Sequence, residues 1–120
     1  MTIYHLEERT FQYSKSCAIL KRQLQRGILG IEFGPQLLRS SSSVGANYIE
    51  ATESLGEKDF QMKIRISIRE AKESAYWLRL MKETIENVNE DGRIDLFINE
   101  TMELRRILAA ILTRYRQNRM

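Results

Sequence analysis

The chain has 120 residues, of which 42% are hydrophobic and 29% charged, with one proline, one cysteine and a net charge of +3. A chain of this length forms one domain with one core, and its composition excludes a chain that is disordered throughout. The single cysteine excludes an intrachain disulfide and a zinc site built on several thiolates.

Targeting signals are missing from the sequence. No stretch is apolar over the roughly 20 residues that a membrane-spanning helix needs. The first ten residues, MTIYHLEERT, contain neither a basic leader nor the apolar run of a secretory signal. We therefore expect residues 1–120 to form a single cytoplasmic domain without membrane contact.

The first helix is expected over residues 7–26, because glycines at 27 and 30 suit the turn that ends it. Helical spacing places Cys17 on the packed side of this helix. The residues in line with it are Phe11, Ser14, Leu20 and Leu24. We interpret Cys17 as a packed thiol rather than a reactive one.

The second helix is expected over residues 35–54, with Pro35 in its first turn, where a missing N–H costs nothing. Its core positions recur at alternating steps of four and three. They are Leu37, Ser41, Val44, Tyr48, Ala51 and Leu55. The serine run at 40–43 lies inside this period, so we expect another helix to approach closely there.

The third helix is expected over residues 57–86, and Ser54 and Glu57 have the spacing of a capping box at its start. Residues 63–69 alternate with period two, which in isolation suits a strand. A helical stripe through the same segment, and the lack of an alternating hairpin partner, favour the helix. The stripe consists of Phe60, Ile64, Ser67, Ala71, Ser74, Leu78, Met81 and Ile85.

The fourth helix is expected over residues 93–116, after a polar turn at 87–92. Its core positions are Phe97, Thr101, Leu104, Leu108, Ile111 and Tyr115. Short connections make consecutive helices antiparallel neighbours. The predicted fold class is therefore all-α, an antiparallel up-down-up-down four-helix bundle.

Two of these helices also carry apolar residues that point away from the core. At about 100° per residue, Ser42, Ala46 and Ile49 lie on the back of the second helix. Ile66 and Trp77 share an off-core angle on the third. Because exposed apolar surface on a small domain often marks a partner interface, we expect a homo-oligomer built through these five residues. The alternative is that Trp77 packs between two helices of one bundle.

The sequence contains no recognisable catalytic, cofactor or metal motif. His5 is the only histidine, which excludes a histidine relay within one chain. Glu70 and Glu73 are three residues apart, but metal-binding bundles need Glu-x-x-His motifs as well. A solvated face shared with Arg69 and Lys72 is the preferred interpretation of this carboxylate pair. We expect no enzyme, no cofactor and no metal.

Basic residues gather in the first and fourth helices. Residues 9–26 and the stretch after 103 contain no acidic residue. Because the first and last helices of such a bundle are neighbours, the two segments predict one positive surface that contacts phosphates. The alternative is an ordinary solvated surface. The residues expected to contact phosphate are Lys15, Lys21, Arg22, Arg26, Arg105, Arg106, Arg114 and Arg116.

Two polar residues of the second helix lie outside the core stripe. Asn47 lies at its edge, where an amide can bond a neighbouring helix and fix register. Glu50 points outward. A structural role is preferred to ligand binding for both.

A longer pattern resembles a known family. The sequence LLRSSSSVGANYIEA at 37–51, followed by EKDF at 57–60 and REAKES at 69–74, is similar to the bacterial four-helix bundle family encoded in intervening sequences of 23S ribosomal RNA genes. Its first motif matches at Arg39, Ser43, Asn47 and Glu50. The resemblance extends to the accessory variability protein of diversity-generating retroelements. It implies a ring-like homopentamer that associates with nucleic acid and with a reverse transcriptase.

The leading hypothesis is a non-enzymatic, oligomeric protein that contacts RNA or DNA backbones through the basic residues of its first and fourth helices. No pattern typical of base readout is present. A reverse transcriptase is a further partner implied by the resemblance alone. The alternative function is a protein-interaction scaffold with no direct nucleic-acid role.

Overall fold

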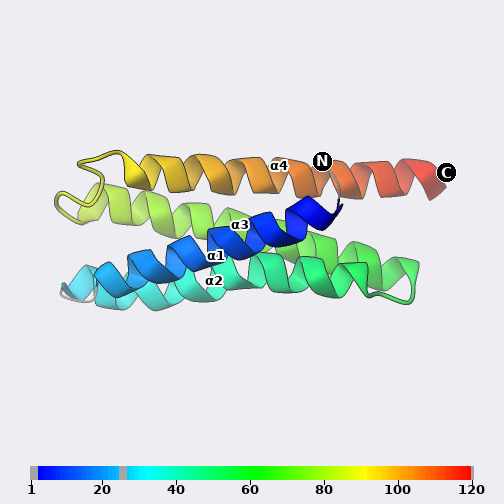
Figure 1. Cartoon of the computed structure of the whole chain (residues 1–120), viewed down its shortest axis with the longest axis horizontal. Helices are drawn as coiled ribbons and strands as arrows, with labels where there is room; N and C mark the ends of the chain where they lie inside the picture. The colour runs from blue at the N-terminus through cyan, green and yellow to red at the C-terminus, as the bar shows by residue number, and fades with distance from the viewer. Residues whose placement is uncertain (1–2, 25–26, 120) are drawn as a thin grey trace.

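Four helices run up, down, up and down along a rod of 49 × 21 × 20 Å (Figure 1). The computed structural model describes residues 3–24 and 27–119, with side chains over 5–24 and 27–115. The helices are α1 (Ile3–Gln23), α2 (Ile28–Thr52), α3 (Glu57–Thr84) and α4 (Arg93–Arg119). The predicted antiparallel four-helix bundle is confirmed, and residues 63–69 lie within α3 rather than in a strand.

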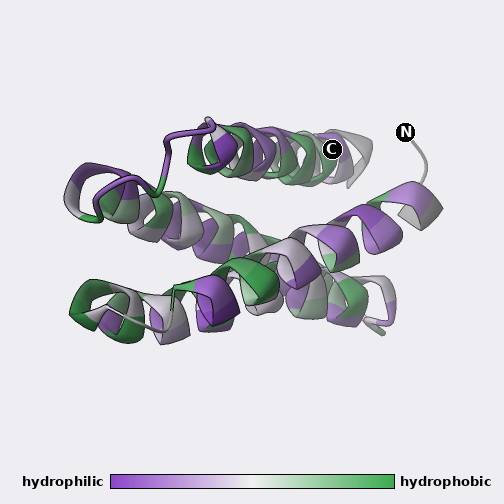
Figure 2. Cartoon of the chain, turned by 60° about the vertical axis from the view of Figure 1, so that its left-hand side comes forward, coloured by the Kyte–Doolittle hydropathy of each residue, from purple (hydrophilic) through white to green (hydrophobic). Residues whose placement is uncertain are grey.

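The helices pack unequally. α2 and α3 lie together along most of their length, whereas α1 crosses obliquely from α4 at its start to α2 at its end (Figures 1 and 2). Hydrogen bonds between side chains join α1 to α4 at several points. Arg9 donates to both carboxylate oxygens of Glu100, the Tyr13 hydroxyl lies 2.6 Å from Thr101 Oγ1, and Arg93 Nη1 donates to Gln23 Oε1 at 2.7 Å. The first and last helices are thus linked mainly through polar contacts.

The predicted core stripes are buried over most of their length. Val44, Ile64, Leu78 and Leu108 each have an exposed fraction of 0%. Hydrophilic and hydrophobic residues alternate along each helix, as amphipathic helices require (Figure 2). Cys17 is also buried, and this burial raises the pKa of its thiol to about 11, which supports a packed rather than a reactive cysteine.

Serines bring α2 close to helices on two sides. Ser40 and Ser41 are both fully buried. Ser74 Oγ of α3 lies 2.8 Å from Ser40 Oγ, and Ser14 Oγ of α1 donates to the Ser41 carbonyl at 2.9 Å. The serine run is therefore a packing element, as its place in the helical period predicts.

The start of α2 differs from the prediction. It begins at Ile28, and Pro35 lies inside the helix instead of opening it. Proline removes the donor that would bond the carbonyl of Ile31, but both residues are exposed, so water can replace that donor. An exposed proline is therefore tolerated in this helix.

Three further details correct the sequence-based expectations. Gly56 is the N-cap of α3 and makes no side-chain cap, while Ser54 Oγ donates to the Glu50 carbonyl at 3.1 Å, so the capping box is wrong. Leu55 falls in the turn after α2 and is exposed instead of buried. Phe11 is 59% exposed, because it lies about 100° from the buried line of α1 that includes Thr10.

Candidate nucleic-acid interface

The side of α3 that faces α2 holds its carboxylates in ion pairs. Arg39 of α2 bridges Glu70 and Glu73 of α3, with 3.1 Å between Arg39 Nη1 and Glu70 Oε2. Trp77 Nε1 donates to Glu73 Oε2 at 2.9 Å, and this bond, together with the Arg39 guanidinium, holds the pKa of the Glu73 carboxyl below its usual range. The Glu70 side chain is only 10% exposed. The predicted solvated face is therefore wrong, since both acids serve to hold Arg39.

The residues of the family motif lie along this same seam between α2 and α3. Arg39 forms the bridge just described, and Glu50 Oε1 lies 3.2 Å from Lys63 Nζ of α3. Asn47 Nδ2 donates to the Ser43 carbonyl at 2.9 Å, so this hydrogen bond stays within α2 and does not reach a neighbouring helix as expected. The contacts of the motif are those of a structural seam.

The opposite side of α3 carries a row of exposed cations. Steps of four and three select seven residues along this side, all of them exposed. We call them the outer face of α3: Lys58, Met62, Arg65, Arg69, Lys72, Tyr76 and Arg79. Within the part of the chain that the structure describes, none of its five cations takes part in an ion pair.

The distribution of acids keeps this face positive. Between residues 60 and 82, α3 contains Glu70 and Glu73 as its acids, and both contact Arg39 of α2. Glu73 is also four residues after Arg69, whose charge helps to lower the pKa of the Glu73 carboxyl. The five cations follow one another over about 30 Å at about 1.5 Å per residue. A hollow of about 460 Å³ opens on this face, lined by Lys58, Gln61, Met62, Arg65, Ile66 and Arg69. A continuous polyanion is the kind of ligand that such a strip suits.

The basic residues predicted on α1 lie on different sides of the helix. Lys15 and Arg22 are exposed and, being seven residues apart, share its outer side. Lys21 lies over α2, where a Cβ added to Gly34 would be 2.9 Å from Lys21 Cγ. Toward α4, α1 presents Arg9, whose guanidinium pairs with carboxylates of α4.

The predicted basic residues of α4 diverge as well. At about 100° per residue, Arg105 and Arg114 point to roughly opposite sides of α4, with Arg106 between them. Arg26 and the side chain of Arg116 lie outside the described residues. The described cations of α1 and α4 are therefore not gathered on one shared face, because the two helices meet through the Arg9 ion pairs instead.

The back of α2 carries a row of mostly apolar residues between 28 and 49, with the exposed Glu32 and Arg39 beside it. Steps of three and four select the outer face of α2: Ile28, Ile31, Pro35, Leu38, Ser42, Ala46 and Ile49. The exposed fractions of Ile28, Ile31 and Ile49 are 77%, 53% and 41%. Ser42, Ala46 and Ile49 are exposed where the sequence placed them.

The two interface residues expected on α3 lie differently. Ile66 and Trp77 are half-buried, and Ile66 lines the hollow on the outer face of α3. The Trp77 ring packs against Phe33 of α2 with 6.0 Å between ring centroids. This geometry favours the intramolecular alternative for Trp77.

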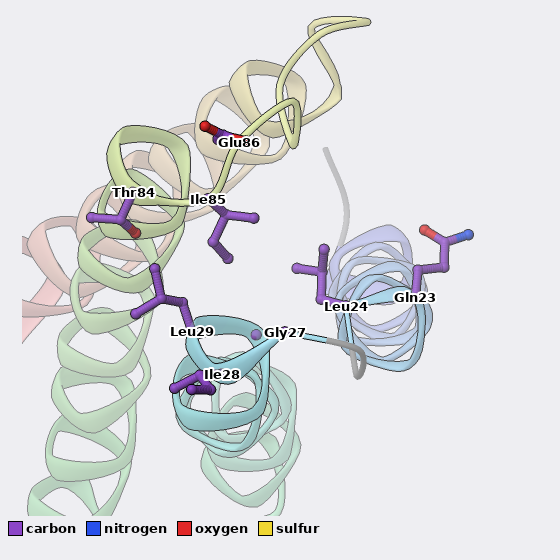
Figure 3. A pocket seen from close by; sticks show the side chains of 9 residues that line it. Gln23, Leu24, Gly27, Ile28, Leu29, Thr84, Ile85 and Glu86 are labelled. Carbon is purple, nitrogen blue, oxygen red and sulfur yellow. The ribbon is translucent and has the colours of Figure 1, made fainter.

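An apolar hollow of about 390 Å³ lies where the α1–α2 turn meets the end of α3 (Figure 3). Leu24 and Ile85 point into the space between these elements, and Leu29 lies beside them. Gln23, Thr84 and Glu86 are the polar side chains among its described lining. The hollow offers little to orient a polar ligand.

The described residues give little support for a metal site or for a membrane-spanning helix. No group of three His, Cys, Asp or Glu side chains among them could hold a metal ion. None of the helices, over the same residues, could span a membrane.

The family is decided by comparison with known proteins. A family model described as 23S rRNA-intervening sequence protein matches residues 6–110. The chain belongs to this family. A crystal structure at 1.70 Å of a protein with unknown function from the S23 ribosomal protein family of Bacteroides thetaiotaomicron VPI-5482 is similar, with a TM-score of 0.82 and 26% identity over 94% of this chain and 99% of that chain. No curated protein matches the chain.

The region matched by the 23S rRNA-intervening sequence protein model includes all of α2 and α3. Stretches without acids do not reveal the outer face of α3, because acids and bases are mixed along this segment. The signal for it in the sequence is the spacing of the cations, which repeats with the same steps of four and three as the core stripe.

Proposed function

We propose that this member of the 23S rRNA-intervening sequence protein family is a non-enzymatic, homo-oligomeric protein that associates with RNA or DNA through the phosphate backbone. The observation that carries the proposal is the outer face of α3, with five exposed cations and no ion pair among the described residues. Each such cation can replace a counterion of the nucleic acid, and the released ions drive binding.

The cations of α1 and α4 enter the proposal as secondary contacts. Lys15, Arg22, Arg106 and Arg114 are exposed and make no ion pair within the described chain. Because they point in several directions, one strand cannot reach all of them on one subunit. They add general attraction rather than an aligned site.

Self-association supports this function by repeating the basic strip. The uncharged outer face of α2 supplies a surface for it, and the resemblance to the retroelement accessory protein suggests a pentamer and a reverse transcriptase as partner. Several copies of a modest site on one particle raise the apparent affinity through effective concentration. Light scattering that finds a 14.1 kDa species at high concentration would contradict the oligomer.

A salt titration tests the association itself. We expect the full chain to bind a fluorescein-labelled RNA of 20 nucleotides, with fluorescence anisotropy as the readout. Five phosphate contacts predict that log K falls with log salt concentration at a slope of about −3.5 for a single strand and about −4.5 for a duplex. A slope near zero, or no binding at low salt, would contradict the proposal.

A second candidate function, a protein-interaction scaffold, is favoured by one observation. The outer face of α2 is apolar and uncharged over seven residues, which is typical of a protein interface. A protein partner rather than a second copy could cover it. Co-purification of one stoichiometric protein by a chain that shows no RNA binding would favour this candidate.

A further inference from the structure

We propose that the outer face of α3 binds single-stranded rather than duplex nucleic acid, and that Tyr76 is the platform on which an unpaired base stacks. This inference rests on the nucleic-acid association proposed above and names the form of the ligand.

Tyr76 lies among the cations of this face. It is four residues after Lys72 and three before Arg79, the two spacings that make side chains neighbours on a helix. Its exposed fraction is 59%. An exposed aromatic ring between two phosphate-binding side chains is the arrangement that proteins use to bind single strands without reading sequence.

The neighbours of Tyr76 hold one side of its ring. Its centroid lies 5.2 Å from that of Trp77, and the two planes are 79° apart. Trp77 is itself fixed by Phe33 and by its hydrogen bond to Glu73. Because this support comes from the packed seam, Tyr76 is presented to solvent with little freedom to lose on stacking.

The spacing of the cations favours a flexible ligand. Lys58, Arg65, Lys72 and Arg79 are seven residues apart, which places them in a nearly straight row at intervals of about 10 Å. A single strand can follow such a row. A duplex winds its phosphates around the axis once in about 34 to 36 Å, so a straight row of about 30 Å meets each strand over only part of its length. Duplex bases are also stacked on one another and cannot reach Tyr76.

The test compares one RNA in two forms. A labelled strand of 20 nucleotides, without self-complementarity, is titrated alone and annealed to its complement. We expect Tyr76→Ala to weaken binding of the single strand by about 5-fold to 150-fold, the range that corresponds to removing one base stack. Tyr76→Phe keeps the ring and should bind within about two-fold of the natural chain.

Phe11→Ala is the matched control, because Phe11 is an aromatic residue with the same exposed fraction of 59% but lies on α1, away from the outer face of α3. It should change single-strand affinity by less than about two-fold, since its ring does not lie among the cations of that face. Circular dichroism should be unchanged for all three variants, while Tyr76→Ala should unfold at a slightly lower temperature because it loses the ring contact with Trp77.

The outcomes separate this inference from the function on which it rests. Loss of single-strand affinity in Tyr76→Ala, with duplex affinity unchanged, supports the inference. Duplex binding as tight as single-strand binding, or a Tyr76→Ala variant that binds both forms like the natural chain, overturns the inference and leaves the association intact. If neither form shows salt-sensitive binding, both proposals fail.

Discussion

Lysine and arginine side chains lie on or near both sides of α3. The two sides differ in whether these cations are paired with carboxylates. Toward α2, Glu70 and Glu73 hold Arg39, and Lys63 pairs with Glu50. On the outer face, none of the five cations takes part in an ion pair within the described residues. The cations on the side toward α2 are neutralised by carboxylates of the same chain. The cations of the outer face remain able to interact with solvent or with a ligand.

This difference teaches that charge counted along a sequence is a poor guide to charge on a surface. The α3 segment contains acids and bases in mixed order, so it reads as an ordinary solvated helix. Once the helix forms, Glu70 and Glu73 reach Arg39 of α2, while the five cations of the outer face fall into a row along the helix. The row of cations on the outer face of α3 therefore forms only when the helix folds.

The largest expected effect comes from placing a larger side chain on the buried side of α3, where the helix packs against α2. Ser67 is fully buried and its Oγ donates to the Val44 carbonyl at 2.6 Å, so α2 and α3 are very close there. We expect Ser67→Leu to lower the free energy of unfolding by about 3 kcal/mol. The matched change on the outer side, Lys72→Leu, should stay within about 0.5 kcal/mol. Urea unfolding followed by circular dichroism measures both, and equal losses would contradict the assignment of the two sides.

A smaller effect should follow from removing one charge of the seam. Glu70→Gln takes away the carboxylate that Arg39 Nη1 contacts at 3.1 Å. Because the Arg39 side chain is 51% exposed, water replaces part of this interaction, and we expect a loss of about 1 kcal/mol. Arg65→Gln on the outer side should change stability by less than about 0.5 kcal/mol. A destabilisation by Arg65→Gln as large as that by Glu70→Gln would show that Arg65 has a structural partner.

The smallest effect on the free energy of unfolding is expected from lowering the pH. The Trp77 N–H and the Arg39 guanidinium lower the pKa of Glu73 in the folded chain from its ordinary value of 4.5. Stability from this carboxylate is therefore fully present above about pH 4.5 and is lost as pH falls through the lowered pKa. We expect the difference in unfolding free energy between the natural chain and Glu73→Gln to shrink below pH 4.5. A difference that is constant from pH 6 to pH 3 would contradict the role of the Glu73 charge.

Much of the fold could be predicted from the sequence because the core stripes keep a strict helical period. Ile64, Leu78 and Leu108 are fully buried where the stripes placed them. The helix boundaries were harder to predict. Proline is common in the first turn of a helix, and nothing in the sequence near Pro35 shows that α2 begins at Ile28. Pro35 is tolerated inside α2 because its position is exposed and water can replace the missing donor. The spacing of residues in the sequence does not show this exposure.

The candidate site was predicted less well than the fold. Partners of charged residues depend on which helix faces which, and the pairing of Arg39 with Glu70 joins residues 31 positions apart. Without that pairing, Glu70 looks like a solvated acid beside Arg69. The spacing of the cations is visible in the sequence, but the ion pairs of Glu70 and Glu73 with Arg39 become visible only in the folded chain.

The central claim, that the outer face of α3 is the nucleic-acid site, is tested most directly by two variants with equal charge. One carries Lys58→Gln, Arg65→Gln, Lys72→Gln and Arg79→Gln, and the other carries Lys15→Gln, Arg22→Gln, Arg106→Gln and Arg114→Gln. Each lowers the net charge from +3 to −1. In titrations of labelled single-stranded RNA, we expect the first variant to flatten the salt slope by about 2.8 and the second by less than about 1. Equal flattening by the two variants, or a larger effect of the second, would contradict the account.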